Sequence, residues 1–316
     1  LKGMAAGAAS SNRTIQYCMP YPSQVLAAAS LPEVTNARAT GDYFHAANQW
    51  AVGSTALFYW ALGILPFKDG FYSSALPQVG GQTVGPETDP DREALMATLS
   101  AAMVGPMDGI YLLNKTRVMA TCRKDGLVLK PDRPLTTTDA CFRRSQPNCQ
   151  VFETSSRPDG WRTIHYYFNN NGSAPLLAEE VYLDPYKPAE GYGVYNWYTG
   201  TLGPLRKVNT LEAGYEGHVY AMVSPVYGRW VFLGDTSAYV PASTTRFPTV
   251  SHDARRLYVH VRRAAGEEVR VCVGRAPSFH VRCRVLAAGT GEVARIVFDS
   301  SEWEGRATSG PKEVII

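Results

Sequence analysis

Apolar runs and helical periodicity alternate along the first 142 residues. Residues 14–19 and 34–42 are short runs of β-branched, aromatic and small residues, which predict strands. Residues 24–30 and 48–62 carry apolar residues at helical spacing, and a proline or glycine follows each of them. This order of strand and helix is typical of parallel βα units.

Charged residues stand where the predicted strands end. Asp42 follows the run that starts at Val34, Lys68 and Asp69 lie in the next apolar segment, and Asp108 follows a further one. In parallel βα units the carboxyl ends of the strands meet at one edge, and the loops at that edge carry function. The pattern therefore predicts a site at this edge.

Arg38 lies four residues before Asp42, at the point where the small and β-branched residues give out. A strand end of this kind can hold a carboxyl group over a pocket, and a neighbouring cation tunes the pKa of that group. The alternative interpretation is a surface arginine and aspartate on either side of a turn.

The pattern changes from about residue 141, where helical periodicity disappears. Alternating strands are predicted at 163–168, 193–198, 217–223, 230–233, 257–261, 269–273 and 281–285. They predict an antiparallel β-sandwich at 143–316, after an α/β domain at 1–142. Arginines such as Arg262 alternate with apolar residues in the last strands, which favours a solvated sheet face over a polyanion site.

Composition excludes several classes of protein. The chain has 316 residues, of which 45% are hydrophobic and 19% charged, as in ordinary globular proteins. A net charge of +3 is too small to indicate a nucleic-acid partner or an anionic membrane surface. The longest apolar run, 55–65, is much shorter than the roughly 20 residues of a membrane span.

The six cysteines show no C-x-x-C spacing, so a zinc site is not expected. The spacing of Cys141 and Cys149 suits a small disulfide loop. Three glycosylation sequons, at Asn12, Asn114 and Asn171, favour a secretory route, with the cytoplasm as the alternative. The chain starts at Leu1 without signal-peptide features, and we expect it to be part of a longer protein.

Five pieces of the first 142 residues match, in order and at similar spacing, the motifs of one enzyme group. Residues 38–43 (Arg-Ala-Thr-Gly-Asp-Tyr) are similar to Arg-Val-Ser-Asp-Asp-Phe, and residues 65–71 (Leu-Pro-Phe-Lys-Asp-Gly-Phe) to Gln-Pro-Asp-Trp-Asp-Met-Phe. Residues 103–108, 125–130 and 137–142 correspond to a strand ending Val-Ser-Asp, to Asp-Gly-Ser-Val-Leu-Arg and to Thr-Arg-Asp-Cys-Leu-Phe. The region thus resembles the catalytic barrel of the raffinose synthase and α-galactosidase group, in clan D of the glycoside hydrolases.

The resemblance implies the second half of a (β/α)8 TIM barrel, followed by the β-sandwich. It also implies a retaining glycoside hydrolase for α-galactoside-like substrates, with Asp42 as general acid and base. The nucleophile of the group ends a barrel strand that would precede Leu1. This piece alone is therefore expected to be inactive and poorly stable, and to need the missing N-terminal half of the barrel as a partner.

The same resemblance implies an oligosaccharide or glycoside ligand and no metal or organic cofactor. The implied substrate-binding residues are Arg38, Tyr43, Trp50, Lys68, Asp69 and Asp108. Carboxylates would bind sugar hydroxyls, and aromatic rings would pack on the pyranose face. Structural alternatives exist, since Trp50 suits a helix core and Asp69 suits a turn before Gly70.

Two departures from the group's motifs leave the substrate open. Gly41 stands where the group has an aspartate, and Lys68 stands where it has a tryptophan. A cation at Lys68 would suit an acidic sugar. The alternatives to hydrolysis are a galactosyltransferase of the raffinose synthase type and a non-catalytic carbohydrate-binding protein.

Overall fold

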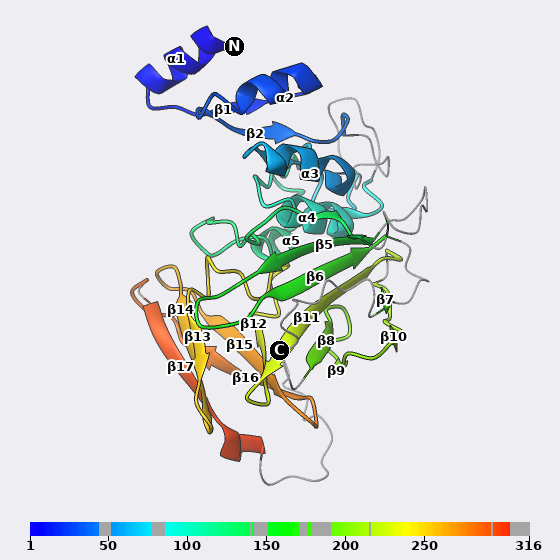
Figure 1. Ribbon diagram of the computed structural model, residues 1–316, viewed down its shortest axis with the longest axis vertical. Coiled ribbons are helices and arrows are strands. Elements are labelled where there is room, and N and C mark those ends of the chain that lie inside the picture. Colours follow the sequence, from blue (N-terminus) through cyan, green and yellow to red (C-terminus); the bar gives the residue numbers. More distant parts are fainter. Residues whose placement is uncertain are drawn as a thin grey trace.

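The computed structural model describes most of the chain (Figure 1). The described residues are 1–43, 52–77, 86–139, 141, 151–170, 176–177, 191–214, 216–291 and 293–303. Along the long axis of the molecule, the N-terminal helices lie at one end and the late strands at the other, with α4 and α5 in between (Figure 1). No helix within these ranges is long and apolar enough to cross a membrane.

The N-terminal region contains a small parallel sheet with helices between its strands. Its elements are α1 (Lys2–Ser10), β1 (Ile15–Tyr17), α2 (Pro22–Ala28), β2 (Val34–Arg38), α3 (Val52–Ala61) and β3 (Leu65–Phe67). The strand order is β1-β2-β3, and both pairings are parallel. Pro22 begins α2, where its missing N–H is no loss, and Gln24 accepts a hydrogen bond from the Tyr21 N–H at 2.7 Å.

Two further helices follow. In α4 (Pro90–Leu99), every residue except Asp91 is buried, so this helix packs on all its sides. The short α5 (Lys115–Met119) is capped by Asn114, whose side chain accepts the Arg117 N–H at 3.0 Å. In Figure 1, α4 lies between α3 and the strands of the next region.

The region from residue 151 onward is built of antiparallel strands. The main sheet contains β4 (Thr136–Thr137), β5 (Val151–Ser156), β6 (Ile164–Asn169), β8 (Tyr192–Asn196), β9 (Leu202–Pro204), β11 (Val219–Tyr227), β12 (Trp230–Gly234), β15 (Val269–Arg275) and β16 (His280–Leu286). A second sheet holds β13 (Val250–His252), β14 (Arg256–Arg262) and β17 (Val293–Asp299), and β7 (Leu176–Leu177) pairs with β10 (Val208–Asn209). A 3-10 helix, Ser300–Trp303, ends the described chain.

The strand β11 is the centre of the main sheet because it pairs with three others. It is antiparallel to β6 over five residues, to β8 over five residues and to β12 at its end. The β11 to β12 hairpin turns at Gly228 and Arg229, both with positive φ (57° and 68°), as a type I′ turn requires. A Cβ at Gly228 would lie 2.6 Å from the His252 ring, so this position requires glycine.

One large hydrophobic core contains α4 and the faces of the antiparallel strands. Its largest fully buried side chains include those of Leu95, Phe168, Tyr220, Trp230, Phe232 and Phe298. A separate small cluster lies beside the parallel sheet and includes Tyr17, Val25, Ala37, Tyr59 and Ile64. The parallel region therefore has a small core of its own, apart from the large one.

The predicted half of a (β/α)8 barrel is wrong. The parallel arrangement stops after three short strands, and the strands that dominate the described chain are antiparallel. The strand expected just before Asp108, at 101–107, is reduced to a single parallel bridge between Phe71 and Pro106. The bridge consists of two hydrogen bonds, from the Phe71 N–H to the Gly105 carbonyl at 3.1 Å and from the Met107 N–H to the Phe71 carbonyl at 2.8 Å. Gly105 weakens a strand here, and Pro106 has no N–H to offer to a further strand on its other side.

The expected sandwich fits the structure only loosely, since one sheet is large, another has three strands and a third has two. The division at residues 142 and 143 stays a prediction, because residues 142–150 lie outside the described ranges. Cys141 is disulfide-bonded, and Cys149 also lies outside those ranges. A second disulfide joins Cys272 and Cys283 on neighbouring strands, which the sequence did not predict.

Candidate functional site

The carboxyl ends of β2 and β3 bring three of the predicted residues together. Arg38 ends β2, Asp42 follows in the next loop, and Asp69 comes just after β3. The Arg38 guanidinium donates to both acids, from Nη2 to Asp42 Oδ1 at 2.7 Å and from Nη1 to Asp69 Oδ2 at 2.9 Å. These residues, Arg38, Asp42 and Asp69, are called the Arg38 cluster below.

The burial of the three side chains differs. Arg38 is 5% exposed, whereas Asp69 is 25% and Asp42 is 46% exposed. Burial alone would lower the pKa of Arg38, but its hydrogen bond to Asp42 and the charge of Asp69 outweigh that effect and raise the pKa. The guanidinium therefore stays charged and holds a carboxylate that reaches solvent.

Asp69 organises the loops around it. Its Oδ2 also accepts the Tyr43 N–H at 2.9 Å, and its Oδ1 accepts the Gly70 N–H at 3.0 Å. Its own N–H donates to Thr40 Oγ1 at 3.1 Å. Asp69 thus connects the loop after β2 to the loop after β3, which is the turn-forming role that its place before Gly70 suggested.

Tyr43 lies in the core, not at the surface. It is 6% exposed, its hydroxyl donates to Glu87, and its ring meets Tyr72 edge-on with 5.5 Å between centroids. Burial first, and then the hydrogen bond to Glu87, raise its pKa far above the ordinary tyrosine value. Its ring therefore packs inside the protein and does not lie at the surface next to Asp42.

Lys68 is also buried. Its ammonium forms an ion pair with Glu93 of α4, and the two side chains are 0% and 1% exposed. The same ammonium lies 5.2 Å from the ring centroids of Tyr43 and Phe71. Lys68 thus joins β3 to α4 and presents no cation to solvent.

Asp108 accepts hydrogen bonds from the backbone. Its carboxylate oxygens receive the Ser73 N–H at 2.8 and 2.9 Å and the Ser74 N–H at 3.2 Å. It therefore fixes the loop at 73–74 and is not part of the Arg38 cluster. Trp50, the remaining predicted residue, lies outside the described ranges.

A second polar network was missed by the sequence interpretation. The ligand atoms of Asp91, Glu216 and His218 lie within 4.8 Å of one another, which is close enough to hold a metal ion. The Glu216 oxygens, however, accept the N–H groups of Asp91 and Arg92 at 2.9 and 2.8 Å, and Arg92 Nε donates to His218 at 3.3 Å. Protein donors and a guanidinium already fill this network, so we assign it a structural role.

The same network keeps His218 neutral. Burial, and then the charge of Arg92, lower its pKa to about 3. Tyr198 bonds to both His218 and Asp91, and burial followed by the Asp91 charge raises the tyrosine's pKa strongly. No short-range pattern in the sequence signalled this site, because Tyr198, Glu216 and His218 lie more than a hundred residues from Asp91 and Arg92.

Comparison with known proteins assigns no family. No family model matches the chain, and no curated protein matches it. Among solved structures, an isomalto-dextranase of Arthrobacter globiformis T6, a glycoside hydrolase complexed with panose, is similar at a TM-score of 0.40 and 9% identity. The alignment covers 90% of this chain and 59% of that one, so the chain spans about three fifths of its neighbour's length. A likeness this weak assigns neither fold nor function.

Proposed function

We propose that this protein acts on carbohydrates by glycosidase-type chemistry, with Asp42 as general acid and base. The observation that supports this is a buried guanidinium at the end of β2 that holds a half-exposed carboxylate. Asp42 has a larger exposed side-chain fraction than Asp69, 46% against 25%. Asp42 is therefore the acid that a bound glycoside would meet.

A retaining glycosidase uses one carboxyl group twice, first to protonate the leaving oxygen and then to activate water. The contact of 2.7 Å with Arg38 holds the Asp42 carboxylate in one position, where it can accept a proton from water in the second step. For the first step, substrate binding would have to lengthen the contact with Arg38. The proposal assigns no residue of this chain as nucleophile.

Asp69 would position Asp42 and bind a sugar hydroxyl with the part of its carboxylate that reaches solvent. Its hydrogen bonds to Tyr43 and Gly70 keep it in place. A preference for acidic sugars is not proposed, because Lys68 is buried against Glu93 and offers no free cation. An α-galactoside is the substrate that the motif resemblance suggests, and the experiment below tests it against other sugars.

The proposal is tested by sugar binding and turnover with the full chain. Saturation-transfer NMR with raffinose, galactose and glucuronic acid would measure binding, and release of p-nitrophenol from aryl α-glycosides would measure turnover. We expect Asp42→Asn to keep sugar binding and to lower any turnover by about 10²- to 10⁴-fold, the usual contribution of a general acid or base. Asp69→Asn should weaken binding itself. Asp253→Asn, at an exposed turn in the β region, is the matched control.

The outcomes separate the candidate functions. Transfer of galactose to an added acceptor sugar supports a transferase. Binding without turnover fits both a non-catalytic carbohydrate-binding protein and a hydrolase whose nucleophile this chain does not supply. If no sugar binds the wild-type chain, or if Asp42→Asn and Asp69→Asn both behave like Asp253→Asn, the Arg38 cluster is not a carbohydrate site.

A further inference from the structure

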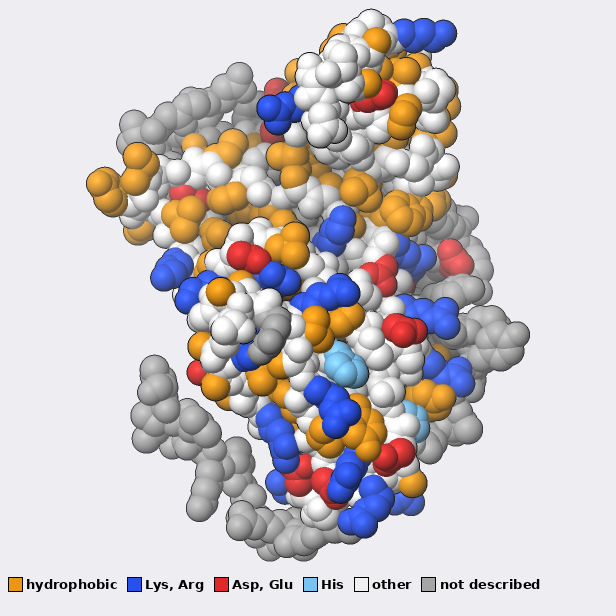
Figure 2. Space-filling view, turned by 90° about the vertical axis from the view of Figure 1, so that its left-hand side faces the viewer, with side chains coloured by type: hydrophobic (Ala, Val, Ile, Leu, Met, Phe, Trp, Pro, Cys, Tyr) orange, Lys and Arg blue, Asp and Glu red, His pale blue; other side chains and the backbone are white. Residues whose placement is uncertain are grey.

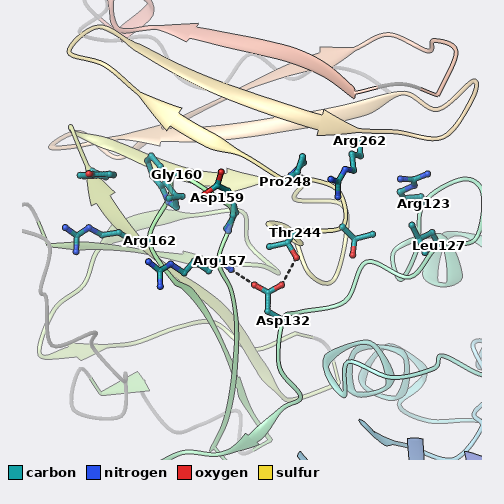
Figure 3. A pocket seen from close by; sticks show the side chains of 14 residues that line it. Arg123, Leu127, Asp132, Arg157, Asp159, Gly160, Arg162, Thr244, Pro248 and Arg262 are labelled. Atoms are coloured by element: carbon teal, nitrogen blue, oxygen red, sulfur yellow. Dashed lines mark hydrogen bonds between the residues drawn. The ribbon is translucent and has the colours of Figure 1, made fainter. Parts of the chain in front are cut away.

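An arginine-lined groove lies in the antiparallel region, and none of its residues belongs to the Arg38 cluster (Figure 3). Its volume is about 1120 Å³, above the range of roughly 300–1,000 Å³ that is usual for small-molecule pockets. Chain segments that are distant in sequence form its walls: the turn after α5, the loop between β5 and β6, the end of β11, residues 244–248 and the end of β14. The charged residues that line it are Arg123, Asp132, Arg157, Asp159, Arg162 and Arg262.

The loop 157–162, which carries two of these arginines, is held rigidly. The Asp159 N–H donates to the Pro248 carbonyl, and the Asp159 carbonyl accepts the Val250 N–H, both at 2.9 Å. Gly160 has φ of +73°, and a Cβ there would lie 2.8 Å from the Val250 oxygen, so only glycine fits. Arg157 and Arg162 are therefore presented from a fixed backbone.

Positive charge exceeds negative charge in the groove. Four arginines face two aspartates, and Asp132 accepts the Arg157 N–H at 2.7 Å and the Thr244 hydroxyl at 2.5 Å (Figure 3). Arg123 is paired with Asp125 at 2.5 Å. Within the part of the chain that the structure describes, no carboxylate lies at ion-pair distance from the guanidinium of Arg157 or Arg262, and both residues are exposed.

Aromatic residues line the groove beside the arginines. The Arg162 guanidinium lies 5.3 Å from the ring centroid of Tyr227, which is 36% exposed. Trp161 is 3% exposed, and within the described ranges its indole Nε1–H meets no acceptor. The Trp161 ring packs edge-on against Tyr227, with 5.5 Å between centroids, and so supports the exposed tyrosine from behind.

We propose that this groove binds an oligosaccharide that carries sulfate or phosphate esters. Planar guanidinium groups match the oxygens of such esters with two parallel hydrogen bonds. The size of the groove suits several sugar units, and the exposed face of Tyr227 suits a sugar ring. This binding does not depend on the Arg38 cluster. Arg262 lies on the solvated face of β14, as its alternation with apolar residues predicted, and from there it would also bind the ligand.

The test measures binding to the full chain by isothermal titration calorimetry. The probes are a heparin-derived hexasaccharide, neutral maltohexaose and inorganic pyrophosphate, each at low and at high salt. The variants are Arg157→Ala/Arg262→Ala in the groove and Arg206→Ala, an exposed arginine outside it. Thermal unfolding of each variant checks that exposed substitutions leave the fold intact.

We expect the hexasaccharide to bind more tightly than maltohexaose, with an affinity that falls as salt rises. The double variant should lose at least tenfold in affinity, while Arg206→Ala keeps wild-type binding. Tighter binding of pyrophosphate than of the hexasaccharide would overturn the assignment to a sugar chain and leave a site for small phosphate anions. Equal binding of the neutral and sulfated sugars, or equal affinities of the double variant and Arg206→Ala, would overturn the groove as an anion site.

Discussion

The parallel region at the N-terminus and the antiparallel region after residue 150 bury their apolar residues very differently. The antiparallel strands enclose Trp230, Phe232 and Phe298 completely. The parallel region exposes Leu57 and other large side chains of α3, and Figure 2 shows hydrophobic side chains gathered over the N-terminal half and cationic ones over the late strands. Both regions contain predicted strands, but only the antiparallel region builds a large core. Burial of apolar surface in that core therefore supplies most of the free energy of unfolding.

The helix α4 connects the two regions. By sequence it belongs with the parallel strands, yet its apolar side chains lie in the core of the antiparallel region. Glu93 pairs with Lys68 on one side, and Glu216 caps its first turn from the other. The Arg38 cluster therefore lies next to the junction, since Tyr43 beside it belongs to the large core.

The largest expected effect contrasts the two cores. Phe232→Ala removes a fully buried ring that packs on Trp161 and Phe247, and should lower the free energy of unfolding by about 3–5 kcal/mol. Val25→Ala, in the small cluster, removes two methyl groups and should cost only about 1–2 kcal/mol. Urea unfolding followed by circular dichroism measures both. Equal losses would show that the two clusters form one cooperative core.

The junction is tested by breaking its buried ion pair. Lys68→Met leaves the Glu93 carboxylate buried without its cation, which should destabilise the protein by about 3–5 kcal/mol. The double variant Lys68→Met/Glu93→Met removes both charges and should recover most of that loss. If the double variant is as unstable as the single one, the loss of stability comes from changed packing and not from the unpaired buried charge.

The pH dependence of stability tests the network on the other side of α4. The folded pKa of His218 is about 3, below its unfolded value of 6.5, so the unfolded chain gains a proton first as pH falls. Stability from this group is complete above pH 6.5 and falls by about 1.4 kcal/mol per pH unit between pH 6.5 and 3. His218→Gln should flatten that part of the curve. An unchanged slope would contradict the role of His218 in this part of the curve.

The smallest effect is expected at the cap of α4. Glu216→Ala removes the acceptor of two backbone N–H groups at the helix start and should cost about 0.5–2 kcal/mol. Glu216→Gln retains acceptor capacity and should lose less. Hydrogen exchange of the Asp91 and Arg92 amides reports the cap directly, and unchanged exchange in Glu216→Ala would contradict its role.

The sequence by itself determined local features, because periodicity and turn residues act over short distances. The strands near residues 15, 34 and 65, the helix near residue 24 and most of the late strands lie where their patterns predicted. The ion pair of Arg38 with Asp42 joins residues four apart, so it too was within reach of the sequence.

Only the tertiary structure decided what depends on partners far apart in the chain. The parallel pairing is reduced to a single bridge at Pro106 after three strands, and Lys68, a predicted substrate-binding residue, is buried in an ion pair with Glu93 of α4. Arginines from the loop 157–162 and from β14 meet in one groove because the loop is bonded to the segment just before β14. Local sequence patterns do not predict these contacts, because the contacts result from packing and backbone pairing between segments that are far apart in the chain.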